Sequence, residues 1–153
     1  MAVKPIPDGY PRVSPYLIVD DGAKAIEFYT QVLGGIERMR MPAPQGRVGH
    51  AEIIFGNSIV MIADEFPDMG HKSAKTIGGT PVTIALYVED VDKTFKAALE
   101  AGAKQTRPVE NKFYGDRSGQ FEDPWGHCWD IMTHIEDVSP AEMMTRMNEA
   151  MPG

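Results

Sequence analysis

The hydrophobic and polar positions of this chain describe the same module twice. In the first copy, residues 14–19 are mostly apolar and are predicted to form a strand. An acidic turn leads into residues 23–33, which are predicted to form a helix with a buried stripe of Ala23, Ala25, Ile26, Tyr29 and Leu33. In the second copy, residues 82–88 are the predicted strand and residues 91–101 the predicted helix. Because further strand-like segments follow each helix, the pattern predicts an α+β fold of tandem βαβββ modules.

The remaining segments complete the two modules. Further strands are expected at 36–41, 48–55, 58–63, 104–109, 117–122 and 127–133. Gly56-Asn57 is a strong signal for a two-residue hairpin turn. We therefore predict a single domain over residues 1–153, with half-modules at about 12–65 and 81–135. The two halves are expected to form a curved mixed sheet with flanking helices, and any ligand site is expected between them.

Two segments lie outside the repeated pattern. Residues 64–81 hold several prolines and glycines and few apolar side chains, so they are either a linker or a mobile flap. Ser139-Pro140-Ala141-Glu142 combines an N-cap, a first-turn proline and a capping-box glutamate, and it predicts a helix over about 139–150. This helix carries a stripe of Met143, Met147 and Met151. The stripe predicts either packing on the sheet or on a sister subunit, or a pliable contact surface for a partner or ligand.

Composition limits the classes of function. The chain has 153 residues and a single cysteine, Cys128, which excludes an internal disulfide and suits a reducing compartment. No apolar run is long enough to span a bilayer, so no membrane partner is expected. A net charge of -7 with scattered basic residues argues against a nucleic-acid partner. A cytoplasmic location is the expectation.

Strand alternation divides the side chains of each predicted sheet between two faces. Leu17 and Val19 are expected to face the helix of the first half, which leaves Tyr16 on the opposite face. If the two halves curve into one cup, its expected lining is Ser14, Tyr16, Met61, Thr83, Tyr87, Cys128 and Asp130. His50 and Glu52 share one face of their strand and lie either in the cup or on the surface.

Several motifs carry a family resemblance: Pro15-Tyr16-Leu17, Ala25-Ile26-Glu27-Phe28-Tyr29, Leu33-Gly34-Gly35, His50-Ala51-Glu52-Ile53, Tyr114-Gly115-Asp116-Arg117-Ser118-Gly119, Glu122-Asp123-Pro124-Trp125-Gly126-His127 and Thr133-His134. Together they resemble the vicinal oxygen chelate superfamily, which includes glyoxalase I, bleomycin-resistance proteins and extradiol dioxygenases. The similarity extends over about residues 10–138 and is closer still to the PhnB-like, glyoxalase-like branch. It implies the duplicated fold and leaves the reaction open.

The resemblance also implies where a metal site would be. Metal enzymes of the superfamily place one ligand on each facing strand, and the matching positions here are Ser14, Met61, Thr83 and Asp130. Only Asp130 carries a side chain that suits a hard divalent ion. We therefore expect a metal-free member without a cofactor. A rearranged divalent-metal site, with His50 and Glu52 joining Asp130, is the alternative.

Individual residues have a functional and a structural interpretation. In the functional interpretation, Asp130 is a general base or a carboxylate that recognises a ligand, and Tyr16 or Tyr87 donates a hydrogen bond. In the structural interpretation, a neighbouring hydroxyl or a water donates a hydrogen bond to the Asp130 carboxylate. His50 with Glu52 either orients a catalytic imidazole or forms an exposed polar pair. Tyr114 and Trp125 are candidate ligand contacts, although an aromatic residue in a turn such as Asp-Pro-Trp-Gly also packs a hairpin end. The expected ligand contacts are therefore Tyr16, Glu52, Met61, Thr83, Tyr87, Tyr114 and Trp125.

Three functions fit these features. The first is a metal-free protein that binds and sequesters a small organic molecule, with Asp130 fixing a cationic or hydrogen-bonding group. The second is a metal-free lyase or isomerase in which Asp130 or His50 removes a proton next to a carbonyl. The third is a lyase or dioxygenase-type enzyme with a rearranged metal site. A homodimer is expected because two-fold dimers are the commonest assembly.

Overall fold

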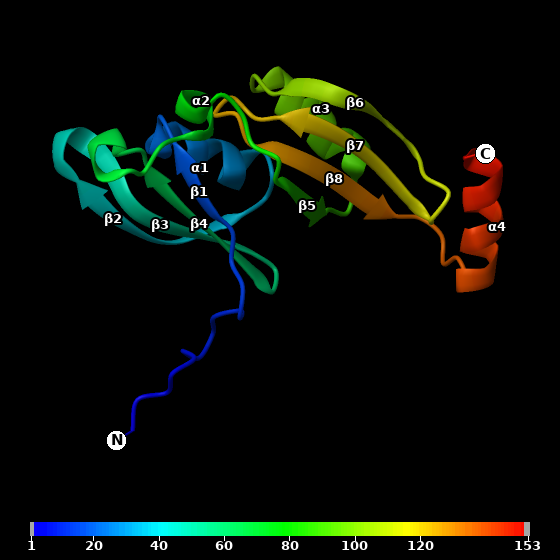
Figure 1. Cartoon of the computed structure of the whole chain (residues 1–153), viewed down its shortest axis with the longest axis horizontal. Helices are drawn as coiled ribbons and strands as arrows, with labels where there is room; N and C mark the ends of the chain where they lie inside the picture. The colour runs from blue at the N-terminus through cyan, green and yellow to red at the C-terminus, as the bar shows by residue number, and fades with distance from the viewer. Residues whose placement is uncertain (1, 152–153) are drawn as a thin grey trace. The chain divides into compact units, whose positions relative to one another are not determined.

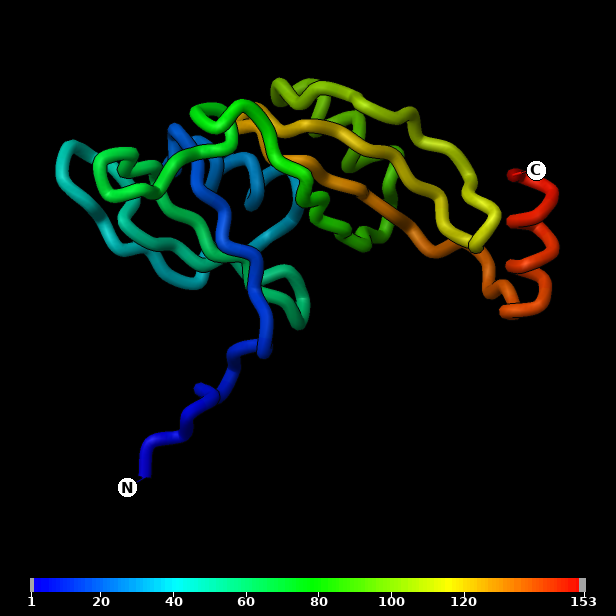
Figure 2. The backbone as a smooth tube through the Cα atoms, in the orientation of Figure 1, coloured from blue at the N-terminus to red at the C-terminus, as the bar shows by residue number. Residues whose placement is uncertain are grey.

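The computed structural model describes residues 2–151 as two compact units (Figure 1). The first unit contains the chain up to Thr80 together with Trp125–His127. The second contains Pro81–Pro124 and the chain from Cys128 onward. Figure 2 follows the backbone through both units. Among the described residues, no helix has the length and apolar character needed to cross a membrane.

The first unit is a four-stranded mixed sheet in the order β1-β4-β3-β2. Its elements are β1 (Tyr16–Val19), α1 (Gly22–Gln31), β2 (Ile36–Ala43), β3 (Arg47–Phe55), β4 (Ser58–Asp64) and α2 (Ala74–Ile77). β1 is parallel to β4, whereas β3 is antiparallel to both β2 and β4. The predicted hairpin turn joins β3 to β4, and Gly56 takes the left-handed backbone angle (φ +59°) that such a turn requires.

Helix α1 covers one face of this sheet, as the sequence predicted. Asp21 caps it by accepting the backbone N–H of Lys24. The buried side is formed by Ala25, Ile26, Phe28 and Tyr29. Ala23, which was predicted to lie on that side, is exposed. The physical reason is helical spacing: the buried stripe contains Gly22, Ala25, Ile26 and Tyr29, and Ala23 lies one position round the helix from it.

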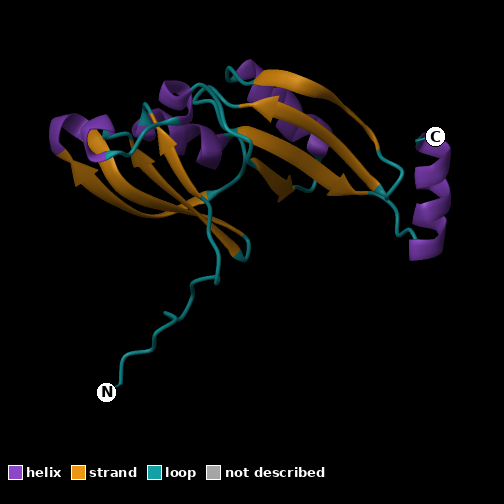
Figure 3. Ribbon diagram, viewed as in Figure 1, coloured by secondary structure: helices purple, strands orange, loops and turns teal. Residues whose placement is uncertain are grey.

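The second unit repeats the plan with the sheet order β5-β8-β7-β6 (Figure 3). Its elements are β5 (Thr83–Tyr87), α3 (Val91–Glu100), β6 (Lys104–Asn111), β7 (Asp116–Glu122), β8 (Cys128–His134) and α4 (Pro140–Ala150). α3 packs against β6, β7 and β8. Phe95 and Phe121 meet edge-on in this core, with ring centroids 5.8 Å apart. The prediction of an α+β fold built from two βαβββ modules is confirmed.

Two segments differ in detail from their predicted form. The 64–81 segment contains a turn of 3-10 helix at Pro67–Met69 and the short helix α2. Strand β8 begins at Cys128 and not at His127, because the backbone pairing with β5 and β7 starts at Cys128. The ring Nε2 of His127 lies 2.9 Å from the carbonyl oxygen of Ile18 in the first unit.

Helix α4 forms where the capping signals predicted it. The Ser139 side chain accepts the N–H of Glu142, and Arg146 pairs with Glu136 at 2.7 Å. None of the described residues of α4 is buried, and Met144 and Met147 are 58% and 41% exposed. The expectation that the methionine stripe packs on the chain's own sheet is therefore wrong. The alternatives of a partner surface and a sister-subunit contact stay predictions.

Candidate functional site

Each sheet has one face covered by its helix and one open face, and the predicted assignment of side chains to these faces is confirmed for β1. In the first unit, Leu17 and Val19 are buried under α1, while Tyr16 is 47% exposed on the open face. Tyr16 lies beside Met61, and Met61 lies beside Glu52, across three adjacent strands. Two groups of chemically active side chains lie on these open faces, one in each unit.

The group in the first unit is a chain of hydrogen bonds that we call the Tyr16 relay: Tyr16, His50 and Glu52. The Oη of Tyr16 lies 2.7 Å from Nδ1 of His50, and Nε2 of His50 lies 3.0 Å from Oε2 of Glu52. His50 and Glu52 alternate with the buried Ala51 on β3, so both point to the open face. The sequence placed this pair on one face, and the structure adds Tyr16 to it.

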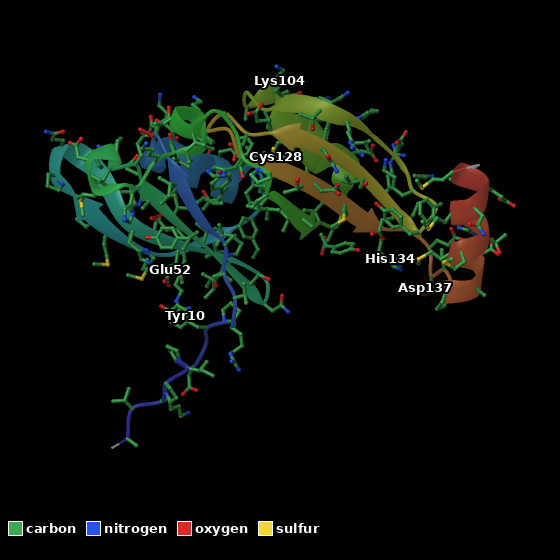
Figure 4. The ribbon with its side chains drawn as sticks, viewed as in Figure 1. Tyr10, Glu52, Lys104, Cys128, His134 and Asp137 are labelled. Atoms are coloured by element: carbon green, nitrogen blue, oxygen red, sulfur yellow. The ribbon has the colours of Figure 1, made fainter. Side chains whose placement is uncertain are left out.

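Glu52 has further partners that hold it in place. It is only 3% exposed, and its Oε1 accepts the hydroxyl of Tyr10 at 3.0 Å. Arg38 lies 3.7 Å from the same carboxylate and stacks over the ring of Tyr10. Figure 4 shows Tyr10 on the N-terminal arm near Glu52. Tyr10 and Arg38 were not predicted as site residues, because neither the arm nor strand β2 carries a signal that aims them at Glu52.

These contacts determine the ionisation of the relay. Burial alone would raise the pKa of Glu52, but hydrogen bonds from His50 and Tyr10, with the charge of Arg38, lower it below its usual value. Burial and the charge of Glu52 raise the pKa of Tyr16. At neutral pH, Glu52 is therefore a carboxylate acceptor and Tyr16 a neutral phenol. Because Glu52 has no proton to give, Nε2 of His50 donates to it, and in the tautomer with its single proton on Nε2, Nδ1 accepts from Tyr16.

The group in the second unit is a pocket of about 160 Å³ that we call the Asp130 pocket. Its lining is Arg107, Lys112, Tyr114, Ser118, Gly119, Gln120 and Asp130. Adjacent strands build it, since Gln120 on β7 lies beside Asp130 on β8 and beside Arg107 on β6. Tyr114, which the sequence indicated as a ligand contact, joins Asp130 here. Arg107, Lys112 and Gln120 were not predicted, because only the folded strands bring them together.

Asp130 is the chemically unusual group in this pocket. Its Oδ2 accepts a weak hydrogen bond from Nε2 of Gln120 at 3.4 Å. Its Oδ1 is buried and has no hydrogen-bond partner in the described part of the chain. An unsatisfied buried acceptor destabilises a fold by roughly 1–3 kcal/mol. A ligand that donates a hydrogen bond to Oδ1 would recover that loss.

The tyrosines predicted as donors to Asp130 bond elsewhere. Tyr16 pairs with His50, and Tyr87 donates to Oδ2 of Asp116 at 2.7 Å. Asp116 is buried, and its other oxygen lies 2.8 Å from Nδ1 of His134. The prediction that Tyr87 serves Asp130 is therefore wrong. The reason is register: Tyr87 lies beside Met132 on β8, whereas Ala85 lies beside Asp130.

The other predicted contacts occupy different environments. Thr83 is exposed at the start of β5, and Met61 is half-buried on the open face of the first unit. Trp125 is buried in the first unit, where its ring meets Phe28 and Tyr29 edge-on at 5.6 and 5.9 Å. Trp125 therefore packs against the aromatic side chains of α1.

The side chains at the family's ligand positions do not fit a hard divalent metal ion. Ser14 and Thr83 offer hydroxyls and Met61 a thioether, which leaves Asp130 as the one suitable donor. Within residues 2–151, no group of three or more His, Cys, Asp or Glu side chains is arranged to hold a metal. Of the residues in the alternative metal site, His50 and Glu52 lie in the first unit and Asp130 in the second.

Comparison with known proteins places this fold in a family. Residues 11–131 match the Glyoxalase/Bleomycin resistance protein/Dioxygenase superfamily. The chain is 40% identical over 146 residues to the uncharacterized protein Mb0911c of Mycobacterium bovis, covering 94% of this chain and 96% of that protein. The chain therefore belongs to the glyoxalase/bleomycin resistance protein/dioxygenase superfamily.

Solved structures share the architecture. TioX from Micromonospora sp. ML1 is 26% identical with a TM-score of 0.62, over 82% of this chain and 99% of TioX. A PhnB protein from Bacillus cereus is similar in fold, with 15% identity, a TM-score of 0.64, and coverage of 80% of this chain and 99% of that protein.

Proposed function

We propose that this chain binds a small organic molecule in the Asp130 pocket without a metal ion. The observation that carries the proposal is the buried, unpartnered Oδ1 of Asp130 on a pocket wall. Binding sites for small molecules are typically concave surfaces with a few polar groups that fix orientation. Asp130 supplies such a group, and Tyr114 supplies an aromatic wall.

The same site indicates the chemistry of the ligand. A carboxylate oxygen accepts hydrogen bonds, so the group next to Asp130 is a cation or a neutral donor. A charge-assisted hydrogen bond favours a cation. The net charge of -7 adds a long-range attraction for cationic molecules. Arg107 and Lys112 line the same pocket, so the cationic group must lie at Oδ1 of Asp130 and away from these two like charges. We therefore propose a ligand with an ammonium, amidine or similar donor next to an apolar or aromatic body.

The finer family and assembly assignments are proposals from the sequence. The motifs that resemble PhnB-like proteins support assignment to that branch. A homodimer and a cytoplasmic location are proposed on the same basis. The proposed activity is sequestration, which predicts binding without turnover.

The proposal is tested with three probes of similar size: benzylammonium, benzyl alcohol and benzoate. Binding is measured by calorimetry and by amide chemical shifts of the ¹⁵N-labelled protein. We expect benzylammonium to bind best, with shifts at Tyr114, Gly119 and Gln120, because it donates to Asp130. The substitution Asp130→Asn is expected to weaken its binding at least about tenfold, because the charge-assisted bond is lost.

Glu122→Gln is the matched control. Glu122 is another carboxylate on the open face of this sheet, but it is not part of the pocket lining. Its substitution is expected to leave binding unchanged. Equal binding of benzylammonium by the wild type and Asp130→Asn would contradict the proposal, as would shifts that map outside the pocket.

A further inference from the structure

The Tyr16 relay has the parts of an acid–base device that sequestration does not use. A buried carboxylate, an imidazole and an exposed phenol are connected by hydrogen bonds of 3.0 and 2.7 Å. Glu52 lies at the buried end and Tyr16 at the exposed end. This is the arrangement in which a carboxylate orients a histidine so that the ring can take a proton from a hydroxyl.

The ring orientation supports proton transfer in one direction. Glu52 is ionised, so it holds the Nε2–H of His50 and leaves the Nδ1 lone pair facing Tyr16. When the Oη of Tyr16 accepts a proton from a bound molecule, its own proton moves to Nδ1. The imidazolium that forms lies 3.0 Å from the Glu52 carboxylate, which stabilises the positive charge.

The surroundings of the relay indicate the kind of molecule that would react. Methionines flank it on the open face: Met61 lies beside Tyr16, Met39 beside Glu52, and Met41 beside His50. Met41 is 53% exposed. Methionine surfaces are apolar and adapt to varied shapes. A flat, apolar molecule with an acidic C–H would contact the methionines and present its proton to Tyr16.

We propose that the Tyr16 relay is a second reactive site, which removes a proton from carbon in an apolar or aromatic substrate. Tyr16 contacts the substrate, His50 receives the relayed proton, and Glu52 is a positioning residue that acts through His50. The site lies entirely in the first unit. It is independent of ligand binding at Asp130, which belongs to the second unit.

The reaction of 5-nitrobenzisoxazole tests the proposal directly. Removal of its ring C–H proton by Tyr16 Oη forms the nitrile, breaks the N–O bond and releases a coloured phenolate, while the phenol proton moves to His50. No oxidant, reductant or cofactor is needed. We expect the protein to exceed the rate of an equal concentration of free imidazole. Tyr16→Phe and His50→Gln should each lower kcat/KM about a hundredfold or more, the lower end of the range for a general base.

Control variants separate the chemistry from the fold. His71→Gln replaces an exposed histidine elsewhere in the first unit, and it should leave the rate unchanged. Glu52→Gln should lower kcat without raising KM, because it changes the stabilisation of the imidazolium and not the surface that the probe contacts. Tyr16→Phe removes one exposed hydroxyl and should keep the circular dichroism of the wild type.

Two results would overturn the proposal. One is a wild-type rate no greater than that of free imidazole. The other is full activity in folded Tyr16→Phe, even if His50→Gln is inactive, because the imidazole would then act without the phenol.

Discussion

Asp64 and Gly22 are joined by a short, buried hydrogen bond, in which Oδ1 of Asp64 accepts the backbone N–H of Gly22 at 2.7 Å. The second oxygen of Asp64 accepts the N–H of Val48, also at 2.7 Å. One carboxylate at the end of β4 therefore connects the start of α1 to β3. Because both of its oxygens are used in buried hydrogen bonds to backbone amides, this residue is a structural centre of the first unit.

Replacement of Asp64 tests this connection. Asp64→Ala should lower the free energy of unfolding by about 2–4 kcal/mol, because two buried amides each lose their acceptor. Asp64→Asn should lower the free energy of unfolding by less, since its side-chain oxygen still accepts a hydrogen bond from one of the two N–H groups. Unfolding in urea measures the free energy of unfolding of both variants. Asp68→Ala, at an exposed position, is the control. A loss below about 0.5 kcal/mol for Asp64→Ala would show that water replaces the carboxylate.

The two glycines after α1 should respond differently to substitution by alanine. A Cβ at Gly35 would lie 2.4 Å from Cγ2 of Ile53 and 2.9 Å from the ring of Phe55. Overpacking of this kind costs about 1–3 kcal/mol. Gly34 has open space but a left-handed backbone (φ +81°), so Gly34→Ala should cost only about 1 kcal/mol of backbone strain. Urea midpoints that rank the two in the opposite order would contradict this account.

His134 should make the stability of the second unit depend on pH. Hydrogen bonds to Asp137 and Asp116 raise the pKa of His134 above its usual 6.5. A raised folded pKa means that this stabilisation is complete below about pH 6.5 and is lost as the pH rises through the higher folded value. We expect the difference in Tm between wild type and His134→Gln to shrink between pH 6 and pH 9. A constant difference would exclude the ion pairs as its cause.

Cys128 should react slowly with thiol reagents. Burial, followed by the charges of Glu122 and Asp123, raises the pKa of its thiol. Since the thiolate is the reactive form, modification by iodoacetamide at pH 8 should be slower than that of the unfolded protein in urea. The rate should still be rising at pH 9. A folded protein that reacts as fast as the unfolded one would contradict the assigned environment.

Much of the fold could be predicted from local patterns. The buried stripe of α1, the Asp21 cap and the Gly56-Asn57 turn each depend on residues close in sequence, and each is present in the structure. Strand alternation also placed Tyr16 on the open face, because the period of a strand does not depend on its neighbours. Symmetry with the first half placed Asp130 on the open face of its own sheet. Which residues of the first turn are covered depends on how the helix packs on the sheet, which buries Gly22 and leaves Ala23 exposed, so the prediction for Ala23 was wrong.

The candidate sites could be predicted only in part. His50 and Glu52 were paired because they lie two positions apart on one strand, but Tyr10, from the distant N-terminal arm, was not found. Asp130 was recognised as a carboxylate on an open face. Its neighbours Gln120 and Arg107 come from β7 and β6, and the sequence contains no signal that sets their register.

The sequence by itself determined the duplicated modules, the caps of α1 and α4 and the alternation of faces along a strand, since these follow from backbone geometry over a few neighbouring residues. Only the tertiary structure decided which polar groups meet. Tyr87 bonds to Asp116 and leaves Oδ1 of Asp130 without a partner among the described residues, because a shift of two residues along a strand changes which side chains are adjacent. Hydrogen bonds act over about 3 Å, so their partners are set by register and packing.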